Sequence, residues 1–479
     1  MGIKKNGWLI SVGVYHRTLP PKYALMAENP SIESLIAHIK ELENVILQLK
    51  EENAWLRAKL ERYEHPKNSR NSSVPPSKDE NRVQRNKSLR LKSGKKVGGQ
   101  PGHEGTTLIM RDSPDKIEEH LPMYCNHCGK DLTATAEELI EKRQVIDIPV
   151  IKPVCVEHRV YGKKCSCGHV TTSPFPTGVK YPIQYGSGTE AMISYLHSRH
   201  YLPFHRIKEL LHDIFGLPIS EGGIHCLLKR FTKKALPFYD QIKGKILQAS
   251  VIGTDETGAK VNGKKNWFWA WQNKKLTYIV HSTNRGIDTI KRVFAKGLHL
   301  AIINHDRWAS HFHCAAQGHQ LCTAHLLRDC NYIEEKYKSS WAIALKDLLM
   351  EALSLKKKLT QVDYYKTNET IELLEKKLND LLHVAINPSH KEAFALQKNL
   401  LKHRNSILLF LYHPKVPPDN NGSERSIRNV KVKQKVSGQF KTEEGAIIYA
   451  INRSIIDTII KSNQNILNGL TLIANFATD

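Results

Sequence analysis

The stretch that decides the fold class is SVIGTDETGA, residues 250–259, in which an apolar run leads to the carboxylate of Asp255. This pattern predicts a strand that ends at Asp255 and presents its side chain at the edge of a sheet. Two further strand patterns, NWFWAWQNKK (266–275) and KLTYIVHSTN (275–284), follow in hairpin order. The sequence therefore predicts three consecutive antiparallel strands.

The next segments turn the hairpins into a mixed sheet. A helical pattern at 286–297 precedes HLAIINHDRW (299–308), which predicts a fourth strand that ends at Asp306, and GHQLCTAHLLRDC (318–330) predicts a short strand followed by a helix. This order is that of a ribonuclease-H-like α/β fold, in which the first and fourth strands are neighbours. We therefore expect Asp255 and Asp306 to lie within reach of each other.

A third carboxylate opens a later helix, DNNGSERSIRNVKVKQK (419–435). Glu424, Arg428, Lys431 and Lys435 are spaced i, i+4, i+7 and i+11, so they share one stripe of that helix. We expect Glu424 to complete an acidic triad and the three cations to face DNA. The alternative is a solvated helix with one Glu-to-Arg pair. Polar residues able to cap this helix are Asp419, Asn420, Asn421 and Ser423.

Three carboxylates at one point repel each other unless a cation lies among them. Ligands that are all oxygen select Mg²⁺ or Mn²⁺, so Asp255, Asp306 and Glu424 predict a site for two such ions. Glu256 is a rival of Asp255, but neighbours on a strand point to opposite sides. Asp306 has an alternative role as a helix cap.

Residues 30–64 carry an apolar ladder whose steps alternate between four and three residues, which is typical of a coiled coil. A lone amphipathic helix is the alternative, but the unbroken spacing and the Glu/Lys-rich flanks favour a dimer. Residues 65–105 predict a flexible basic linker, because ten Lys/Arg face two acids over 67–100. The positions of the ladder are Leu35, Ile39, Leu42, Ile46, Leu49, Asn53, Leu56, Leu60 and Tyr63.

Residues 106–178 contain two close cysteine pairs separated by a strand-like stretch, which predicts a zinc ribbon that holds one structural Zn²⁺. The second pair, with a single residue between its cysteines, is tighter than usual. His169, His158 and Cys155 are therefore alternatives for the fourth ligand. The four candidate cysteines are Cys125, Cys128, Cys165 and Cys167.

The remaining segments read as helical. Residues 179–249 outline a helix-turn-helix, with Gly216 ending one helix and Ser220 beginning the next, although any helical hairpin has this outline. The catalytic core then spans 250–333 and 413–479. The intervening residues 334–412 carry helical period and predict an all-helical insertion.

Composition limits the partners. The chain of 479 residues has a net charge of +24, which fits a phosphate-rich partner. No apolar run approaches the roughly 20 residues of a spanning helix, so no membrane partner is expected. Nine cysteines, an odd number with two close pairs, favour a metal site in a reducing compartment. We therefore predict a cytoplasmic, nucleoid-associated bacterial protein.

Several blocks together resemble the DDE transposases of the group named for insertion sequence 66. They are DETG (255–258), HDRW (305–308), CTAHLLRD (322–329), the long block at 417–446, and the linker blocks HPKNSRNSSVPPSKD (65–79) and GGQPGHEGTTL (98–108). The resemblance implies catalytic Asp255, Asp306 and Glu424. It also implies a Cys-x-x-His pair, Cys322 and His325, that braces the site rather than binding Mg²⁺.

The resemblance further implies an enzyme that cuts the ends of a mobile element and joins them to target DNA. Expected partners are those DNAs, a second copy of the chain through the coiled coil and, as an option, accessory proteins of the same element. Two alternatives are a dimeric zinc-ribbon DNA-binding regulator without catalysis and a ribonuclease-H-like nuclease that cuts without joining. The presence of all three acids argues against the first, and the long DNA-binding apparatus argues against the second.

Overall fold

The computed structural model describes residues 31–64, 66–68, 71–72, 79, 102, 108–365 and 368–476. The chain divides into two units that are described separately here. The smaller comprises residues 1–69 and 74–81, and the larger comprises 70–73 and 82–479. Most of the predicted basic linker, 65–105, lies outside the described residues.

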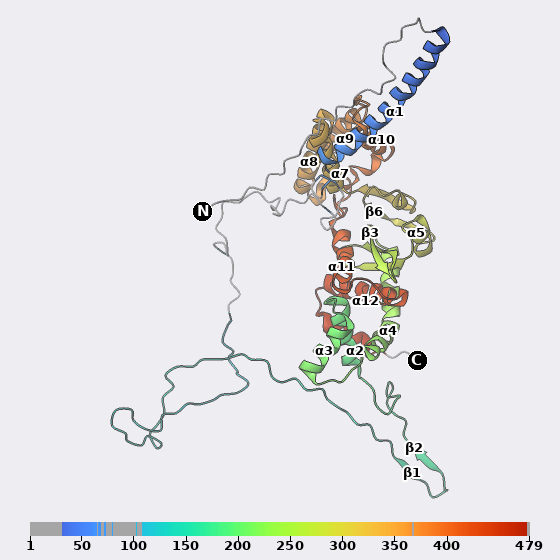
Figure 1. The fold of residues 1–479 in the computed structure, drawn as a ribbon. Helices are drawn as coiled ribbons and strands as arrows, with labels where there is room; N and C mark the ends of the chain where they lie inside the picture. The colour runs from blue at the N-terminus through green and yellow to red at the C-terminus, as the bar shows by residue number, and fades with distance from the viewer. Residues whose placement is uncertain are drawn as a thin grey trace, which may run out of the picture. The chain divides into compact units, whose positions relative to one another are not determined.

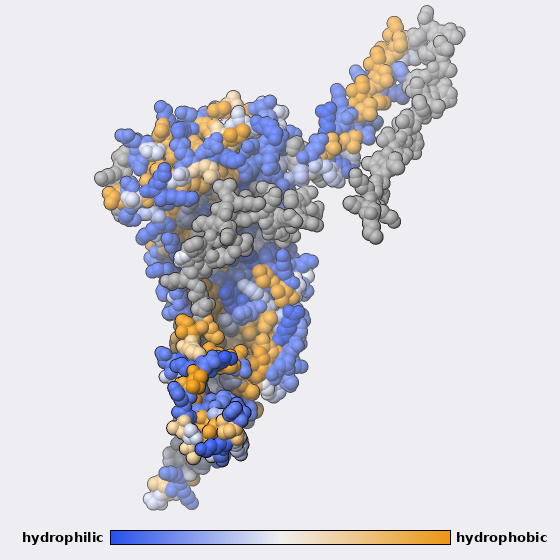
Figure 2. Space-filling model, turned by 90° about the vertical axis from the view of Figure 1, so that its left-hand side faces the viewer, coloured by the Kyte–Doolittle hydropathy of each residue, from blue (hydrophilic) through white to orange (hydrophobic). Residues whose placement is uncertain are grey.

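The smaller unit contains one long helix, α1 (Ile32–Glu64), which covers the range predicted for the coiled coil. The apolar ladder is exposed along its whole length, and about half of the surface of Leu42 is accessible. Figure 2 shows these apolar side chains as a row along the helix. Asn53, at a seam position, bonds its amide to the Leu49 carbonyl of its own helix (3.1 Å). The helix is thus confirmed, while its pairing with a second copy stays a prediction.

Residues 108–184 of the larger unit are mostly exposed and irregular, and they contain a hairpin made by β1 (Gly162–Lys164) and β2 (Val170–Thr172). Helices follow, and two of them form the predicted hairpin: Gly216 ends the first in a left-handed conformation, and Ser220 caps the second by accepting from Gly223 N (3.0 Å). These helices are α2 (Ser187–Ser194), the π-helix η2 (Tyr195–Arg199), α3 (Phe204–Phe215) and α4 (Glu221–Leu247).

A five-stranded mixed sheet lies at the centre of the larger unit, in the order β5-β4-β3-β6-β7. The first three strands pair antiparallel, and β6 joins β3 in parallel, which confirms that the first and fourth core strands are neighbours. The strands are β3 (Val251–Val261), β4 (Lys264–Gln272), β5 (Thr277–Ser282), β6 (Leu298–His305) and β7 (Ala316–Leu321).

One strand boundary differs from the prediction. Strand β3 does not end at Asp255 but continues to Val261, paired with β4 throughout. Its pairing with β6, however, stops at Gly253. Asp255 therefore lies at the edge of the sheet because β6 has ended there, and β3 itself runs on, paired among the described strands only with β4.

Both faces of the sheet are covered. Because successive strand residues point to opposite faces, Trp269 and Trp271 of β4 enter one core with α4, while Phe268 and Ala270 enter another with α11 and α12. Figure 1 shows α11 and α12 beside the strands. A third core joins the insertion helices to β6 and β7.

The predicted insertion 334–412 is helical throughout its regular elements. Its first residues, 334–337, are the end of α7, and it precedes the helix that carries Glu424. No helix among the described residues is long and apolar enough to cross a membrane. The remaining helices are α5 (Ile287–Val293), α6 (Ala309–Phe312), α7 (Thr323–Tyr337), α8 (Ser340–Lys358), α9 (Glu369–Leu382), α10 (Lys391–Lys402), α11 (Asn421–Ser437), α12 (Glu443–Lys461) and α13 (Ile466–Ala474), with short 3₁₀ turns at Gln361–Tyr365, Arg404–Ser406 and Leu409–Leu411.

Candidate active site

The register of the sheet places the first two carboxylates opposite each other. The parallel pairing of β3 with β6 ends at the pair Gly253 and Asn304. Asp255 and Asp306 each lie two residues beyond that pair, so both carboxylates leave the sheet at the same edge and level. The predicted strand order implies that these two residues are neighbours, and the structure adds the exact register.

Helix α11 brings the third carboxylate to this edge because its first turn packs directly on β3. A Cβ atom added to Gly253 would lie 2.5 Å from Ser423 Oγ and 2.9 Å from Asn420 Oδ1. Only glycine allows the helix to approach the strand so closely. Glu424 follows Ser423 in the first turn of α11, and its charge acts on Asp255.

The three carboxylates influence one another electrostatically. Burial raises the pKa of Asp255 well above its ordinary value, and three neighbouring carboxylates raise it further. These neighbours are Glu256, Asp306 and Glu424. Burial also raises the pKa of Asp306, although His311 opposes the effect. Without a cation among them, the protonated forms of Asp255 and Asp306 are therefore favoured.

Glu424 is held beside helix α7. Its Oε1 lies 3.7 Å from a guanidinium nitrogen of Arg328 and 3.8 Å from Nε2 of His325. Burial lowers the pKa of His325 to about 3, with Arg328 and Arg307 adding to the effect, so this imidazole is neutral at pH 7. Oε1 is buried, yet it accepts no hydrogen bond from any described residue.

Arg328 was not predicted as part of the site. It lies three residues after His325, so the two side chains share one face of α7. That spacing is visible in the sequence, but it gives no indication of which carboxylate the face meets. The ion pair of Glu424 is with Arg328 of another helix and not with Arg428 of its own, contrary to the surface-helix alternative.

Glu256 has a separate set of partners. Its Oε1 accepts from Arg285 Nε at 2.6 Å, and its Oε2 accepts from His311 Nε2 at 2.9 Å. Burial alone raises the pKa of Glu256, but these hydrogen bonds outweigh it and lower the pKa. Both oxygens are thus occupied, which leaves Asp255 as the carboxylate of β3 that is open to a metal. Arg285 and His311 were not predicted, because no local spacing links them to Glu256.

Cys322 joins two of the elements that carry carboxylates. Its main-chain N–H donates to the His305 carbonyl (2.9 Å), next to Asp306. Its Sγ accepts from the main-chain N–H of Asn420 (3.1 Å), at the start of α11. Burial raises the pKa of Cys322 to about 11, so it is a neutral thiol. The bracing role that the resemblance implies for Cys322 stays a prediction.

The three predicted DNA-binding cations differ in exposure. Arg428 and Lys435 are exposed on α11. Lys431 is half-buried, and its ammonium donates to the Gly258 carbonyl of β3. Two of the three predicted cations therefore face solvent, and the third is bonded to the protein itself. Another cation of this helix, Lys433, is buried and donates to the carbonyls of Tyr201 (3.3 Å) and Leu202 (3.2 Å).

The predicted zinc ligands form two separate tight turns. Gly129 N donates to the Cys125 carbonyl (2.8 Å), and Gly168 N donates to the Cys165 carbonyl (2.9 Å), so each pair lies in a similar turn. The two partner cysteines, Cys128 and Cys167, are exposed free thiols. Within the described residues, no group of three or more His, Cys, Asp or Glu side chains is placed to hold a metal ion. The zinc ribbon thus stays a prediction.

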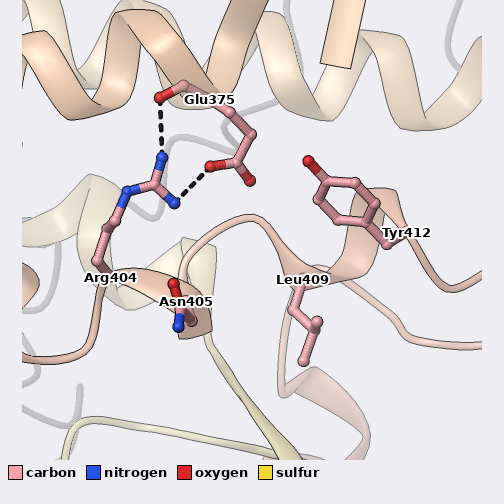
Figure 3. Close-up of a pocket in the computed structure, with 5 residues that line it drawn as sticks. All are labelled: Glu375, Arg404, Asn405, Leu409 and Tyr412. Atoms are coloured by element: carbon pink, nitrogen blue, oxygen red, sulfur yellow. Dashed lines mark hydrogen bonds and ion pairs between the residues drawn. The ribbon is translucent and has the colours of Figure 1, made fainter. Parts of the chain in front are cut away.

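A pocket of about 360 Å³ lies among the insertion helices and contains none of the three carboxylates. Figure 3 shows that Arg404 crosses it, binding the Glu375 carboxylate at 2.6 Å and the Glu375 carbonyl at 3.0 Å. The cation is therefore already neutralised by a residue of the fold. We assign this pocket a structural role; its other lining residues are Asn405, Leu409 and Tyr412.

Comparison with known families identifies the class of protein. Residues 182–447, more than half of the chain and including all three carboxylates, match a family of transposases, which are enzymes that process DNA. The chain belongs to the Transposase IS66 family, and the resemblance seen in the sequence is confirmed. Residues 24–108 match a second group, described as Family of unknown function (DUF6444). No curated protein matches the chain.

Proposed function

We propose that this transposase cuts the ends of an insertion element and joins them to target DNA in a ribonuclease-H-like core. Asp255, Asp306 and Glu424 would be its catalytic carboxylates. The observation that carries the proposal is their convergence: a strand, a strand end and the first turn of a helix bring them into electrostatic contact. Two of these side chains come from segments more than 100 residues apart in the chain.

The oxygen donors of these residues have the chemistry that a divalent cation requires, although the three described side chains do not form a ready-made metal group in this structure. A carboxylate whose pKa is raised by neighbouring carboxylates, as that of Asp255 is, is stabilised in its charged form by a metal ion placed among them. The buried Oε1 of Glu424, which has no hydrogen-bond donor among the described residues, offers an open ligand position. Oxygen-only donors favour two Mg²⁺ or Mn²⁺ ions. When bound, such ions activate the attacking oxygen and stabilise the leaving oxygen at phosphorus.

The protein's own groups would prepare the site for this chemistry. The Glu256 carboxylate, held by Arg285 and His311, would keep the middle of β3 in place without competing for the metal. Arg328 forms an ion pair with Glu424 on its α7 side, and the neutral His325 lies beside the same oxygen. Water would attack the element end in the first step, and the freed 3′-hydroxyl would attack target DNA in the second. Both steps are displacements at phosphorus that use the same carboxylates.

The DNA would lie over the exposed side of α11. Arg428 and Lys435 are accessible there, and the chain's net charge of +24 favours phosphate contacts. Lys431 would contribute less to phosphate contacts than its position on the helix predicted, because its ammonium is bonded to β3. The α3–α4 hairpin and the cysteine-rich region, with one Zn²⁺ held by Cys125, Cys128, Cys165 and Cys167, are further candidates for contact with the element ends.

Dimerisation through α1 would bring two element ends together. Its exposed apolar ladder matches the spacing at which two helices pack as a coiled coil. Asn53 at the seam would fix the register of the pair. Exposure of so long an apolar row in a single chain is costly unless a partner covers it.

The decisive experiment compares Glu424→Gln with Glu443→Gln, a matched control in the first turn of α12. Both proteins are incubated with labelled element ends, target DNA and Mg²⁺. We expect Glu424→Gln to bind the ends with unchanged affinity but to lose cleavage and joining, whereas Glu443→Gln should keep both. Cleavage by Glu424→Gln at the rate of the control would refute the triad. Cleavage by the unmodified protein without joined products would instead indicate a nuclease.

A further inference from the structure

One buried residue is linked by hydrogen bonds, directly or through Cys322, to each of the elements that carry the three carboxylates. Asn420 precedes α11 and is 2% exposed. The sequence predicted it as a helix cap, but its side chain makes no capping bond to a main-chain N–H of α11. Its hydrogen-bonding groups are directed instead to a strand, to a cysteine and to a serine side chain.

The amide nitrogen of Asn420 holds the strand that carries Asp255. Nδ2 donates to the Thr254 carbonyl at 2.7 Å, immediately before Asp255. Because β6 stops pairing with β3 at Gly253, this carbonyl has no β6 partner. The Asn420 amide takes the place of the missing strand and fixes the backbone from which the Asp255 side chain projects.

The main chain of Asn420 connects to the other two carboxylates. Its N–H donates to Cys322 Sγ (3.1 Å), and the Cys322 N–H in turn donates to the carbonyl of His305, next to Asp306. Its carbonyl accepts from the N–H of Glu424 (3.2 Å), which sets the first turn of α11. Asn420 is thus connected through one or two hydrogen bonds to each backbone segment that carries a carboxylate.

The Asn420 side chain is itself held from the far side. Its Oδ1 accepts from Ser423 Oγ at 2.6 Å, and this hydroxyl accepts from Gln272 Nε2 at 3.2 Å. Gln272 Oε1 accepts from Lys461 at the end of α12 (2.9 Å). Both the nitrogen and the oxygen of the amide are therefore engaged, and its orientation is determined by these two partners.

We propose that Asn420 is a positioning residue that sets the spacing of the three carboxylates for their metal ions. This inference rests on the proposed function, since it assumes that the carboxylates bind metal. Loss of a hydrogen bond behind a ligand typically weakens metal affinity or activity about 10–100-fold. Asn420→Ala should therefore bind metal more weakly, and extra metal should restore much of its activity.

The test measures Mn²⁺ binding to DNA-free protein by electron paramagnetic resonance, together with the Mg²⁺ dependence of cleavage. Asn421→Ala is the matched control, because Asn421 is the adjacent asparagine and is exposed. We expect Asn420→Ala to weaken Mn²⁺ binding and to raise the Mg²⁺ concentration for half-maximal cleavage, each about 10-fold or more. DNA-end affinity should not change, and the Asn421→Ala protein should match the unmodified protein.

The outcomes separate this inference from the proposed function. If the unmodified protein shows no Mn²⁺ binding, or if its Mn²⁺ binding persists in Glu424→Gln, the proposed function fails. If that binding exists and Asn420→Ala retains it at full affinity, the positioning role alone is refuted. A lower folded fraction with unchanged metal affinity would also refute it, since that is the result for a structural cap. Should Asn420→Ala not fold, Ser423→Ala decides, with a smaller shift expected in the same direction.

Discussion

Gly253 offers a direct test of how closely α11 must approach β3. In Gly253→Ala the new methyl group would lie 2.5 Å from Ser423 Oγ and 2.6 Å from Gln272 Nε2. Ordinary contact begins at 3.4 Å, so the first distance is about 0.9 Å too short. The backbone of Gly253 is not left-handed, so the added atom is the only source of strain.

The protein can respond to the methyl group in two ways. Either the first turn of α11 moves away by most of that 0.9 Å, or Ser423 rotates and leaves Asn420 Oδ1 without its donor. Overpacking of this kind costs about 1–3 kcal/mol of stability. A displacement of about 1 Å in a catalytic group costs roughly 100-fold in rate. Both responses displace Glu424 or loosen the residues that hold it.

The assay is single-turnover cleavage of a labelled element end at saturating protein, with unfolding by denaturant measured in parallel. We expect Gly253→Ala to cleave roughly 100-fold more slowly while binding DNA normally. Gly258→Ala is the control on the same strand, because its methyl group would meet no atom closer than 3.6 Å. If both variants cleave at the unmodified rate, the close approach of helix and strand does not matter for the chemistry, and the reasoning is refuted.

Three other predictions concern charge and assembly. Asp255→Asn should stabilise the metal-free protein at neutral pH by roughly 0.5–2 kcal/mol, because a folded protein that contains an acid with a raised pKa loses stability as pH rises through that pKa. The same substitution should abolish stabilisation by Mg²⁺. A lower melting temperature of the metal-free variant would contradict this prediction. Burial lowers the pKa of Lys433 to about 7, so the unfolded chain binds the extra proton above pH 7 and stability rises with pH. Relative to Lys433→Met, the free energy of unfolding of the unmodified protein should increase by roughly 2 kcal/mol between pH 7 and 9, as measured by denaturant titration. If the two proteins show the same pH dependence, burial of Lys433 is not the cause. Leu42→Lys should convert the dimer to monomers in sedimentation while Lys40→Glu does not, and unchanged sedimentation of both would remove α1 as the dimer contact.

The sequence by itself determined the features that depend on local periodicity. Alternating apolar residues gave the strands, and the heptad spacing gave helix α1. The position of Asp306 just after a strand and the hairpin between Gly216 and Ser220 also follow from local pattern. Strand order then placed Asp255 beside Asp306, because a mixed sheet of that order has few arrangements.

Only the tertiary structure decided which partner each polar side chain has. Glu424 and Lys431 lie on one stripe of α11, yet one faces α7 and the other bonds to β3. Asn420 is a residue type that commonly caps helices, but its side-chain amide donates to a carbonyl of β3 that β6 leaves unpaired. The physical reason is that periodicity fixes which face a residue occupies, whereas its hydrogen-bond partner comes from whichever distant segment packs against that face.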